Sequence, residues 1–425
     1  MKTNGLTLDQ APPITIPFKF FLTASMFSVA VGIIITIHGD AVFVSRWSPL
    51  VLGITHLLTV GFLAQVMIGA MMQLLPVLAG SPILAVKSIS WLVHVSLLCG
   101  ASMMASGFFV INYQVLSFGA ILVVFSIALF LFVIVISLLK SGNYQNNVIP
   151  IGLGWLAIIP TVAIGLLMVL DLIGIVKVDN LSHLTEVHLS WGILGWVGIV
   201  VFATVNQLLP VFYITKESIS NEARVIYIAI FSFLFLLTVG YLFDQSKNLQ
   251  FPIQLVIAGL FVFMSYRVIQ VLQNRKRKIL DITLVFLWTG LASILFAAIA
   301  WLLLENELLV GVLLLGGVCT TVPIGIIYKV IPFLCWYHLQ SFNIKQGKLS
   351  SGLPSMKHYI RDKEAKRHYA IHVTALILLV LATLKPEELA RISGVVYCLS
   401  SGYFLKNLLS AISRFHKARQ KLVLC

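Results

Sequence analysis

Twelve long apolar segments dominate this sequence and restrict what it can fold into. Each has about the 20 residues that an α-helix needs to cross a bilayer core of about 30 Å. Within hydrocarbon the backbone polar groups must bond inside the spanning segment, so such segments form helices. We predict an all-α polytopic membrane protein with about 12 transmembrane helices, in a single transmembrane domain over residues 1–425. The predicted spans are residues 17–38, 47–78, 84–110, 115–140, 150–176, 183–213, 223–243, 251–273, 280–304, 308–337, 367–384 and 389–412.

The charged residues support this assignment and predict an orientation. Only 10% of the 425 residues are charged, against about 25% in a typical soluble domain. In a soluble protein the formal net charge of +14 would suggest nucleic acid as a partner. Here the basic residues gather in loops on one side, so we expect membrane lipid and no nucleic acid. Because basic loops remain inside, both termini are predicted to be cytoplasmic, in a bacterial inner membrane.

One long connection separates the tenth and eleventh spans. Residues 338–366 combine Gly347, Gly352 and Pro354 with many basic side chains. We expect a cytoplasmic loop here. Its composition fits both a flexible connector and a segment that contacts anionic lipid.

Three of the spans share a sparse sequence pattern, in which only a few spaced positions agree. They read GFLAQVMIGAMMQLLPV from Gly61, GWVGIVVFATVNQLLPV from Gly195 and GVCTTVPIGIIYKVIPF from Gly317. In each copy a small residue follows after eight positions, a long polar residue after twelve and a proline after fifteen. The polar residues are Gln73, Gln207 and Lys329, and the prolines are Pro76, Pro210 and Pro332.

The three copies fall on the second, sixth and tenth spans, which is the same position in three groups of four. This pattern predicts a triplicated unit over about residues 15–140, 150–273 and 280–412. Small residues at such spacing also let unrelated membrane helices pack closely. Three ordinary helices with a common packing stripe are therefore the alternative.

Histidines offer the widest ligand chemistry in this sequence. An ionisable group inside a bilayer is a functional hypothesis by default, and imidazole binds haem iron and copper. His56 and His188 lie in the outer halves of the second and sixth spans, so we expect both to bind a cofactor. His94 and His183 are further metal candidates, against the plainer roles of an interhelical hydrogen bond and an exposed helix end.

His368 and His372 stand one helical turn apart at the start of the eleventh span. An i, i+4 pair of histidines can bind a metal ion. Their neighbours Lys366 and Arg367 favour an interfacial polar cluster instead.

The polar residues of the shared pattern indicate a different function, which is transport. Gln73, Gln207 and Lys329 are predicted to lie near the inner face, where they would line the inner mouth of a transporter or channel. The sequence contains no phosphate-binding loop, no HExxH and no Ser-His-Asp order that would indicate hydrolytic chemistry.

Two stretches carry a family resemblance. His56 with GAMMQLLPV, and HLSWGILGWVGIVVFATVNQLLPV from His188, resemble the catalytic subunit of the haem-copper oxidase and nitric oxide reductase superfamily. The resemblance implies twelve helices in three four-helix units. It also implies a low-spin haem on His56, and copper or its non-haem iron counterpart on His188.

The sequence departs from that family at the remaining ligands. The repeat register places the family's His-x-His pair of helix ten at Val310 and Val312, and helix seven lacks the paired histidines of the copper site. Without these ligands the usual oxygen-reducing centre cannot form. The resemblance thus extends to the fold and not to oxygen reductase activity, and whether the protein is an enzyme stays open.

The register of the two histidines leaves two arrangements open. His56 stands five positions before its repeat glycine and His188 stands seven before its own. Two residues turn a helix by about 200°. The two imidazoles therefore either share one site between the spans or belong to two separate sites.

Three functions fit these observations. The first is a divergent oxidase-like protein that binds b-type haem, or copper, for electron transfer, for handling nitric oxide or another small gas, or for haem and metal homeostasis. Its partners would include a c-type cytochrome or a subunit of a respiratory complex. The second is a cofactor-free transporter or channel. The third is an assembly partner of a respiratory complex.

Overall fold

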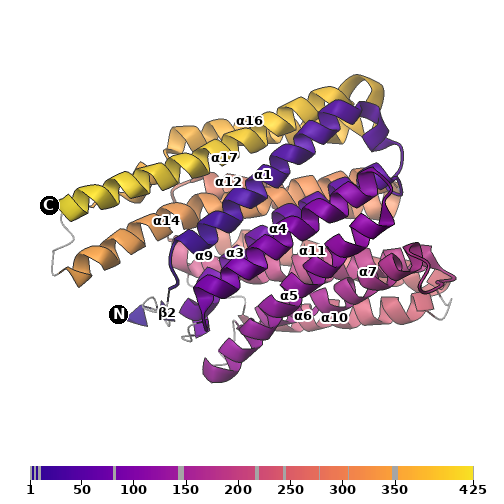
Figure 1. Ribbon diagram of the computed structural model, residues 1–425, viewed down its shortest axis with the longest axis horizontal. Helices are drawn as coiled ribbons and strands as arrows, with labels where there is room; N and C mark the ends of the chain where they lie inside the picture. Colours follow the sequence, from indigo (N-terminus) through magenta and orange to yellow (C-terminus); the bar gives the residue numbers. More distant parts are fainter. Residues whose placement is uncertain are drawn as a thin grey trace.

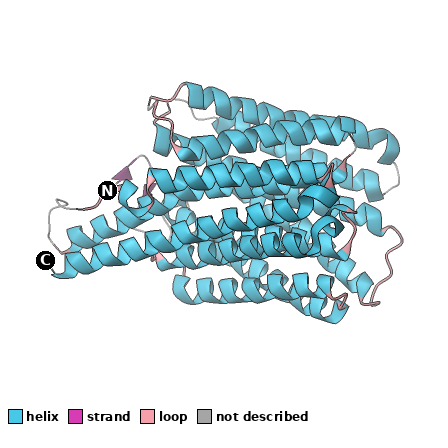
Figure 2. Cartoon of the chain, turned by 90° about the horizontal axis from the view of Figure 1, so that it is seen from above, coloured by secondary structure: helices cyan, strands magenta, loops and turns pink. Residues whose placement is uncertain are grey.

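Helices make up almost all of the described structure (Figures 1 and 2). This computed structural model describes residues 2–3, 6–7, 11–79, 83–141, 148–215, 220–242, 246–276, 278–304, 306–346 and 353–424. Near the N-terminus, β1 (Lys2–Thr3) pairs antiparallel with β2 (Leu6–Thr7). The rest of the protein is a bundle of helices.

The helices follow one another with short connections. The α-helices are α1 (Thr15–His38), α2 (Pro49–His56), α3 (Gln65–Ala79), α4 (Val86–Phe109), α5 (Tyr113–Ser141), α6 (Val148–Leu156), α7 (Ile158–Leu172), α8 (Leu181–Leu189), α9 (Ile199–Tyr213), α10 (Ser220–Leu242), α11 (Ser246–Gln273), α12 (Ile282–Ile299), α13 (Glu307–Gly311), α14 (Thr321–Lys345), α15 (Met356–Tyr359), α16 (Asp362–Ala382) and α17 (Pro386–Leu424). A 3-10 helix, η2 (Gly39–Phe43), follows α1, and π-helices occupy η3 (Leu57–Ala64), η4 (Ser190–Gly198), η5 (Ala300–Leu304) and η6 (Val312–Thr320).

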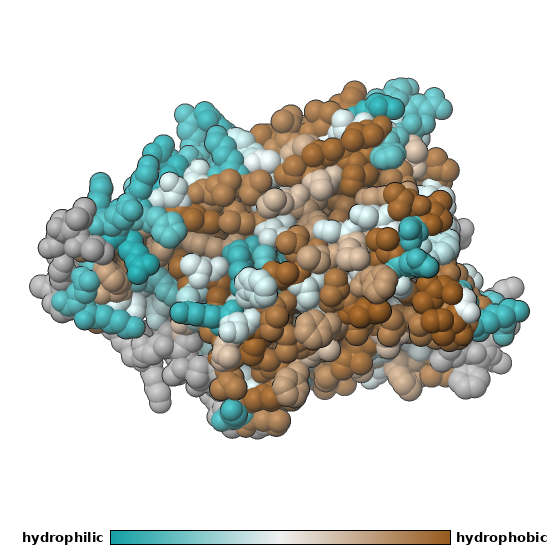
Figure 3. All heavy atoms as spheres, in the orientation of Figure 1, coloured by the Kyte–Doolittle hydropathy of each residue, from teal (hydrophilic) through white to brown (hydrophobic). Residues whose placement is uncertain are grey.

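Twelve continuous helical stretches are long and apolar enough to cross a membrane, counted over the described residues. The predicted all-α polytopic fold is confirmed, because each stretch coincides with one predicted span. Large apolar side chains point outward along them, and Figure 3 shows the resulting apolar band between hydrophilic ends. The surface is thus the one that a bilayer requires.

The predicted loop over residues 338–366 is wrong in extent. Helix α14 continues to Lys345, and α16 already begins at Asp362. Polar residues continue both helices beyond the apolar band. A search for apolar residues alone does not detect such extensions. Residues 347–352, with Gly347 and Gly352, lie outside the described residues.

Packing in the bundle brings the two ends of the sequence together. Helix α1 packs along α17, α17 packs along α16, and α4 packs along α5. Figure 1 shows the N- and C-termini at the same end of the bundle, as an even number of spans requires. We call this the terminal end, and the other the distal end.

A π-helical segment recurs at the repeat glycines. Gly61 lies in η3, Gly195 in η4 and Gly317 in η6. Each segment follows a short α-helix at the distal end and leads into a long one that contains the proline. A π-helical turn is rare and is frequent at functional sites. Its recurrence favours the triplicated unit, which stays a prediction.

Glycines let α1 and α17 approach closely. A Cβ atom on Gly394 would lie 2.5 Å from the backbone nitrogen of Thr36, and one on Gly32 would lie 2.6 Å from the Cα of Cys398. Gly402, on the same helix α17, has nothing within 4 Å of such a position. Backbone atoms cannot move aside as a flexible side chain can.

We expect Gly394→Ala to lower the free energy of unfolding by about 1–3 kcal/mol, the range for an overpacked core. Thermal unfolding of the purified protein in detergent measures this loss. Gly402→Ala is the matched control and should keep the melting temperature of the wild type. Equal melting temperatures for all three proteins would contradict the close packing of α1 on α17.

Candidate functional site

A cavity of about 1200 Å³ opens among the helices that carry the shared pattern. Its lining comes from α2 and η3, from α8 and η4, and from α13 and η6, with further residues of α4, α5 and α7. Most of the lining is apolar. His56 and His188 both lie in its wall. The volume exceeds the roughly 300–1,000 Å³ of a common small-molecule pocket.

The ring of His56 is held by its own helix. His56 ends α2, and its Nδ1 donates to the backbone oxygen of Leu52 at 2.8 Å. The imidazole stacks on Phe108 of α4, with ring centroids 5.2 Å apart and planes 25° apart. In the neutral imidazole, a proton on Nδ1 leaves the lone pair on Nε2.

His188 is held by a neighbouring helix. Its Nδ1 donates to the backbone oxygen of Thr161 in α7 at 2.8 Å. Gly165 lies one turn further along α7, and a Cβ there would approach the His188 Cε1 to 2.9 Å. The missing side chain at Gly165 thus makes room for the imidazole. Here too, Nε2 keeps its lone pair.

The structure brings the two imidazoles into one site. Their ring centroids lie 6.3 Å apart and their planes differ by 30°. Of the two arrangements that the sequence left open, the shared site is therefore the one formed. Both imidazoles are thus close enough to act on one bound group. Neither Nε2 has a hydrogen-bond partner among the described residues.

A charged cluster lies in the cavity wall toward the distal end. Arg46 forms ion pairs with Glu186 of α8 and with Glu307 of α13, the latter at 2.7 Å. The Arg46 guanidinium also lies over the Trp47 ring, 4.5 Å from its centroid. This cluster joins the second, sixth and tenth spans. Sequence reasoning missed it, although Arg46 stands directly before the second span as an isolated basic residue.

Two polar atoms of the cavity wall lack a partner. Nδ1 of His183 and Nε1 of Trp196 are buried without a hydrogen bond to any described residue. The His183 ring lies 5.4 Å from that of Tyr241, centroid to centroid. A bound molecule could satisfy both atoms, since buried polar groups normally have partners.

The other candidates of the sequence lie elsewhere. His94 bonds to the Thr23 hydroxyl through Nε2 at 2.8 Å and packs edge-on against Phe20. Gln73 is buried, and the side-chain oxygens of Gln73 and Gln207 lack a partner among the described residues. Neither glutamine is among the residues that line the cavity.

Lys329 also lies away from the cavity, in an ion pair with Asp281. The hydroxyl of Tyr213 donates to the same carboxylate at 2.8 Å. The side chain of Lys329 therefore joins α14 to the start of α12, and its charge is neutralised there.

The polar cluster predicted at His368 and His372 is present, and it is buried between helices. Their exposed fractions are only 0% and 3%. Tyr328, Ser400 and Thr321 occupy the nitrogens of the two rings. The flanking residues at 366 and 367 are exposed, because one helix can present charges to one side and histidines to the other.

Among the described residues, the histidine pair is not part of a larger group of metal ligands. The described residues contain no group of three or more His, Cys, Asp or Glu side chains that could hold a metal ion. A scan against protein-family models finds no match to this protein, and a search of curated proteins finds none either. The resemblance to the oxidase family therefore stays an expectation.

We expect both His56 and His188 to be neutral with the proton on Nδ1 in protein prepared without haem. Backbone oxygens only accept, so each Nδ1 must donate. Histidine-specific ¹⁵N labelling with His56→Gln and His188→Gln to assign the signals distinguishes the two ring tautomers by NMR. A signal for protonated Nε2 at either residue would contradict the geometry of the site.

Proposed function

We propose that this protein binds a b-type haem through His56 and His188 and transfers electrons within a membrane. The observation that carries the proposal is the pair of imidazoles, 6.3 Å apart, each anchored through Nδ1 with Nε2 free at the cavity. Histidine ligands of metals almost always donate their other ring nitrogen in this way. Haem iron accepts imidazole nitrogen as an axial ligand.

The cavity is suited to such a group. Its volume of about 1200 Å³ and mainly apolar wall can take a large planar ligand. Arg46 lies in the same wall, and so do the unpartnered atoms of His183 and Trp196. The unpartnered atoms of His183 and Trp196 offer hydrogen bonds to the acidic edge of a haem.

The histidine pair favours electron transfer over gas handling. When bound, haem supplies one-electron chemistry. His56 and His188 would both hold the iron, which favours one-electron transfer over the binding of a small gas. Copper fits less well, because its sites combine more ligands than the His56 and His188 pair, and the described residues bring no third ligand into a group with them.

The membrane context that we propose follows from the charges. Basic loops at the terminal end favour cytoplasmic termini, in a bacterial inner membrane. Arg46, Glu186 and Glu307 then face the outer side, close to the histidines. A c-type cytochrome or a respiratory subunit docked on that face would be the electron partner.

The oxidised and dithionite-reduced optical spectra of protein purified in detergent test the haem assignment. We expect a Soret band and sharp reduced alpha and beta bands, as for haem with two nitrogen ligands. His56→Ala and His188→Ala should each abolish or shift these bands. His94→Ala is the matched control, since this half-buried histidine bonds to Thr23 away from the cavity, and it should leave the bands unchanged.

A featureless spectrum in protein produced with ample haem would overturn the proposal. It would leave a cofactor-free transporter as the function to test, with the same cavity as its binding site. Retention of the bands in both His56→Ala and His188→Ala would place the haem elsewhere.

Gly165→Ala tests the fit of the His188 ring without removing a ligand. The added methyl group lies 2.9 Å from Cε1, so the imidazole must shift. We expect a lower haem content per protein, or shifted alpha bands, in the pyridine haemochrome assay and the spectrum. Gly152→Ala is the control, because a Cβ at this position meets nothing within 4 Å. An unchanged spectrum in Gly165→Ala would contradict the placement of His188.

A further inference from the structure

The exposed stripe of α16 changes from apolar to basic toward the terminal end of the bundle. Its exposed residues recur at spacings of three and four, which place them on one side of the helix. In the distal part of the stripe these residues are Leu381, Ile377, Thr374 and Ala370. Toward the terminal end the stripe continues with Arg367, Lys366 and Lys363. Such a change suits a helix that passes from hydrocarbon into the head groups of a bilayer.

Helix α17 indicates the depth of this basic segment. Glu388 and Lys406 are both exposed and stand 18 positions apart within α17, which is about 27 Å along the helix axis. The hydrocarbon core of a bilayer is about 30 Å thick. If Glu388 lies near one surface of the bilayer, Lys406 therefore lies near the other.

Stacked rings place Lys406 beside the basic part of α16. The Lys406 Nζ lies over the Tyr403 ring, 5.0 Å from its centroid. This ring stacks in turn on His368 of α16, with centroids 6.2 Å apart and planes 10° apart. His368 directly follows Arg367 in the sequence. Four exposed cations thus lie within about one turn of the same depth on two packed helices, and we call them the basic cluster: Lys363, Lys366, Arg367 and Lys406.

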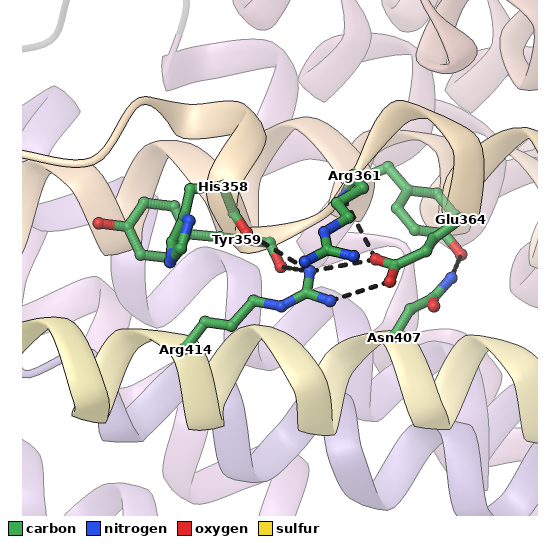
Figure 4. Close-up of polar contacts among 7 residues, drawn as sticks. His358, Tyr359, Arg361, Glu364, Asn407 and Arg414 are labelled. Atoms are coloured by element: carbon green, nitrogen blue, oxygen red, sulfur yellow. Dashed lines mark hydrogen bonds and ion pairs between the residues drawn. The ribbon is translucent and has the colours of Figure 1, made fainter.

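The acidic side chains near the basic cluster already have cationic partners. Glu364 pairs with Arg414, which reaches across from α17 (Figure 4). Asp362 pairs with Lys357. Among the described residues, no ion pair involves a member of the basic cluster. The charge of the four cations is therefore left to attract an anion from outside the protein.

We propose that the basic cluster binds the phosphate group of an anionic phospholipid such as phosphatidylglycerol. Lysine and arginine both bind phosphate, and the planar guanidinium of Arg367 can contact two of its oxygens. The acyl chains of the lipid lie along the apolar part of the stripe, between Ala370 and Leu381. Free phosphate has no such chains, and an acidic protein stays outside the hydrocarbon. A lipid is therefore the occupant that uses both parts of the stripe.

The lipid site is independent of the haem site. No member of the basic cluster is among the described residues that line the cavity. Lys406 belongs to α17 and the other three cations belong to α16, so one bound phosphate connects the two helices. A variant that loses the lipid should keep the optical spectrum of the wild type, so the two proposals fail separately.

Binding of a labelled lipid tests the proposal. The full-length protein in micelles of a neutral detergent is titrated into phosphatidylglycerol that carries a fluorophore on an acyl chain, and fluorescence anisotropy measures the affinity. Labelled phosphatidylcholine, whose head group has no net charge, is the comparison. We expect the wild type to bind phosphatidylglycerol at least about tenfold more tightly. Lys366→Gln combined with Arg367→Gln should lower this affinity at least about tenfold, because both lost charges face the lipid.

A charge-matched variant separates this site from the general positive charge of the terminal end. Lys417 and Lys421 are exposed on α17 and stand 11 and 15 positions after Lys406, about 16 Å and 22 Å further along the helix axis. Salt at about 0.15 M screens charges over about 8 Å. Lys417→Gln combined with Lys421→Gln should therefore keep the wild-type affinity. Elution from a sizing column and the melting temperature establish that both double variants are folded.

Several results would overturn the lipid site. The first is equal affinity of the wild type for the two labelled lipids. The second is a wild-type affinity in the folded variant at positions 366 and 367, or an equal loss in the variant at positions 417 and 421. The third is displacement of the labelled lipid by millimolar inorganic phosphate, because a site that phosphate alone can fill does not need acyl chains.

Discussion

Hydrocarbon offers no hydrogen bonds, so each polar group inside this bundle must find its partner within the protein. Four histidines of the bundle meet this requirement in two ways. His56 and His188 each have one nitrogen bonded to a backbone oxygen and the other free at a cavity. His368 and His372 have both nitrogens bonded to side chains. The first arrangement leaves one ring nitrogen free to bind a ligand, whereas the second leaves none.

The backbone decides where a histidine can bond through one nitrogen and keep the other free. Thr161 lies within α7, where its oxygen is already directed along the helix axis, and the lack of a side chain at Gly165 lets His188 reach it. His56 uses the oxygen of Leu52 in its own helix, directly before the π-helical segment η3. A wider helical turn changes the direction in which following side chains point. The cavity opens among such segments of the second, sixth and tenth spans.

The sequence was sufficient to predict the helices. It was insufficient to predict which side chains meet between them. Apolar length alone predicted all twelve spans, because the bilayer imposes it, and the histidines of the site were chosen on depth and residue type. Their meeting depends on the rotation of two helices that are not neighbours in sequence, which periodicity does not define. Arg46 was passed over because its two carboxylate partners, Glu186 and Glu307, lie 140 or more positions away. At His368 and His372 the adjacent charges indicated a polar cluster but did not indicate its burial between helices.

The cavity wall bears on the cost of charge at the histidine pair. A charge placed at His56 and His188, inside a medium of low dielectric constant, is costly unless a nearby opposite charge offsets it. Arg46, Glu186 and Glu307 are the charged side chains in the described lining of the same cavity, so an electron that arrives at the histidine pair would be felt by this cluster.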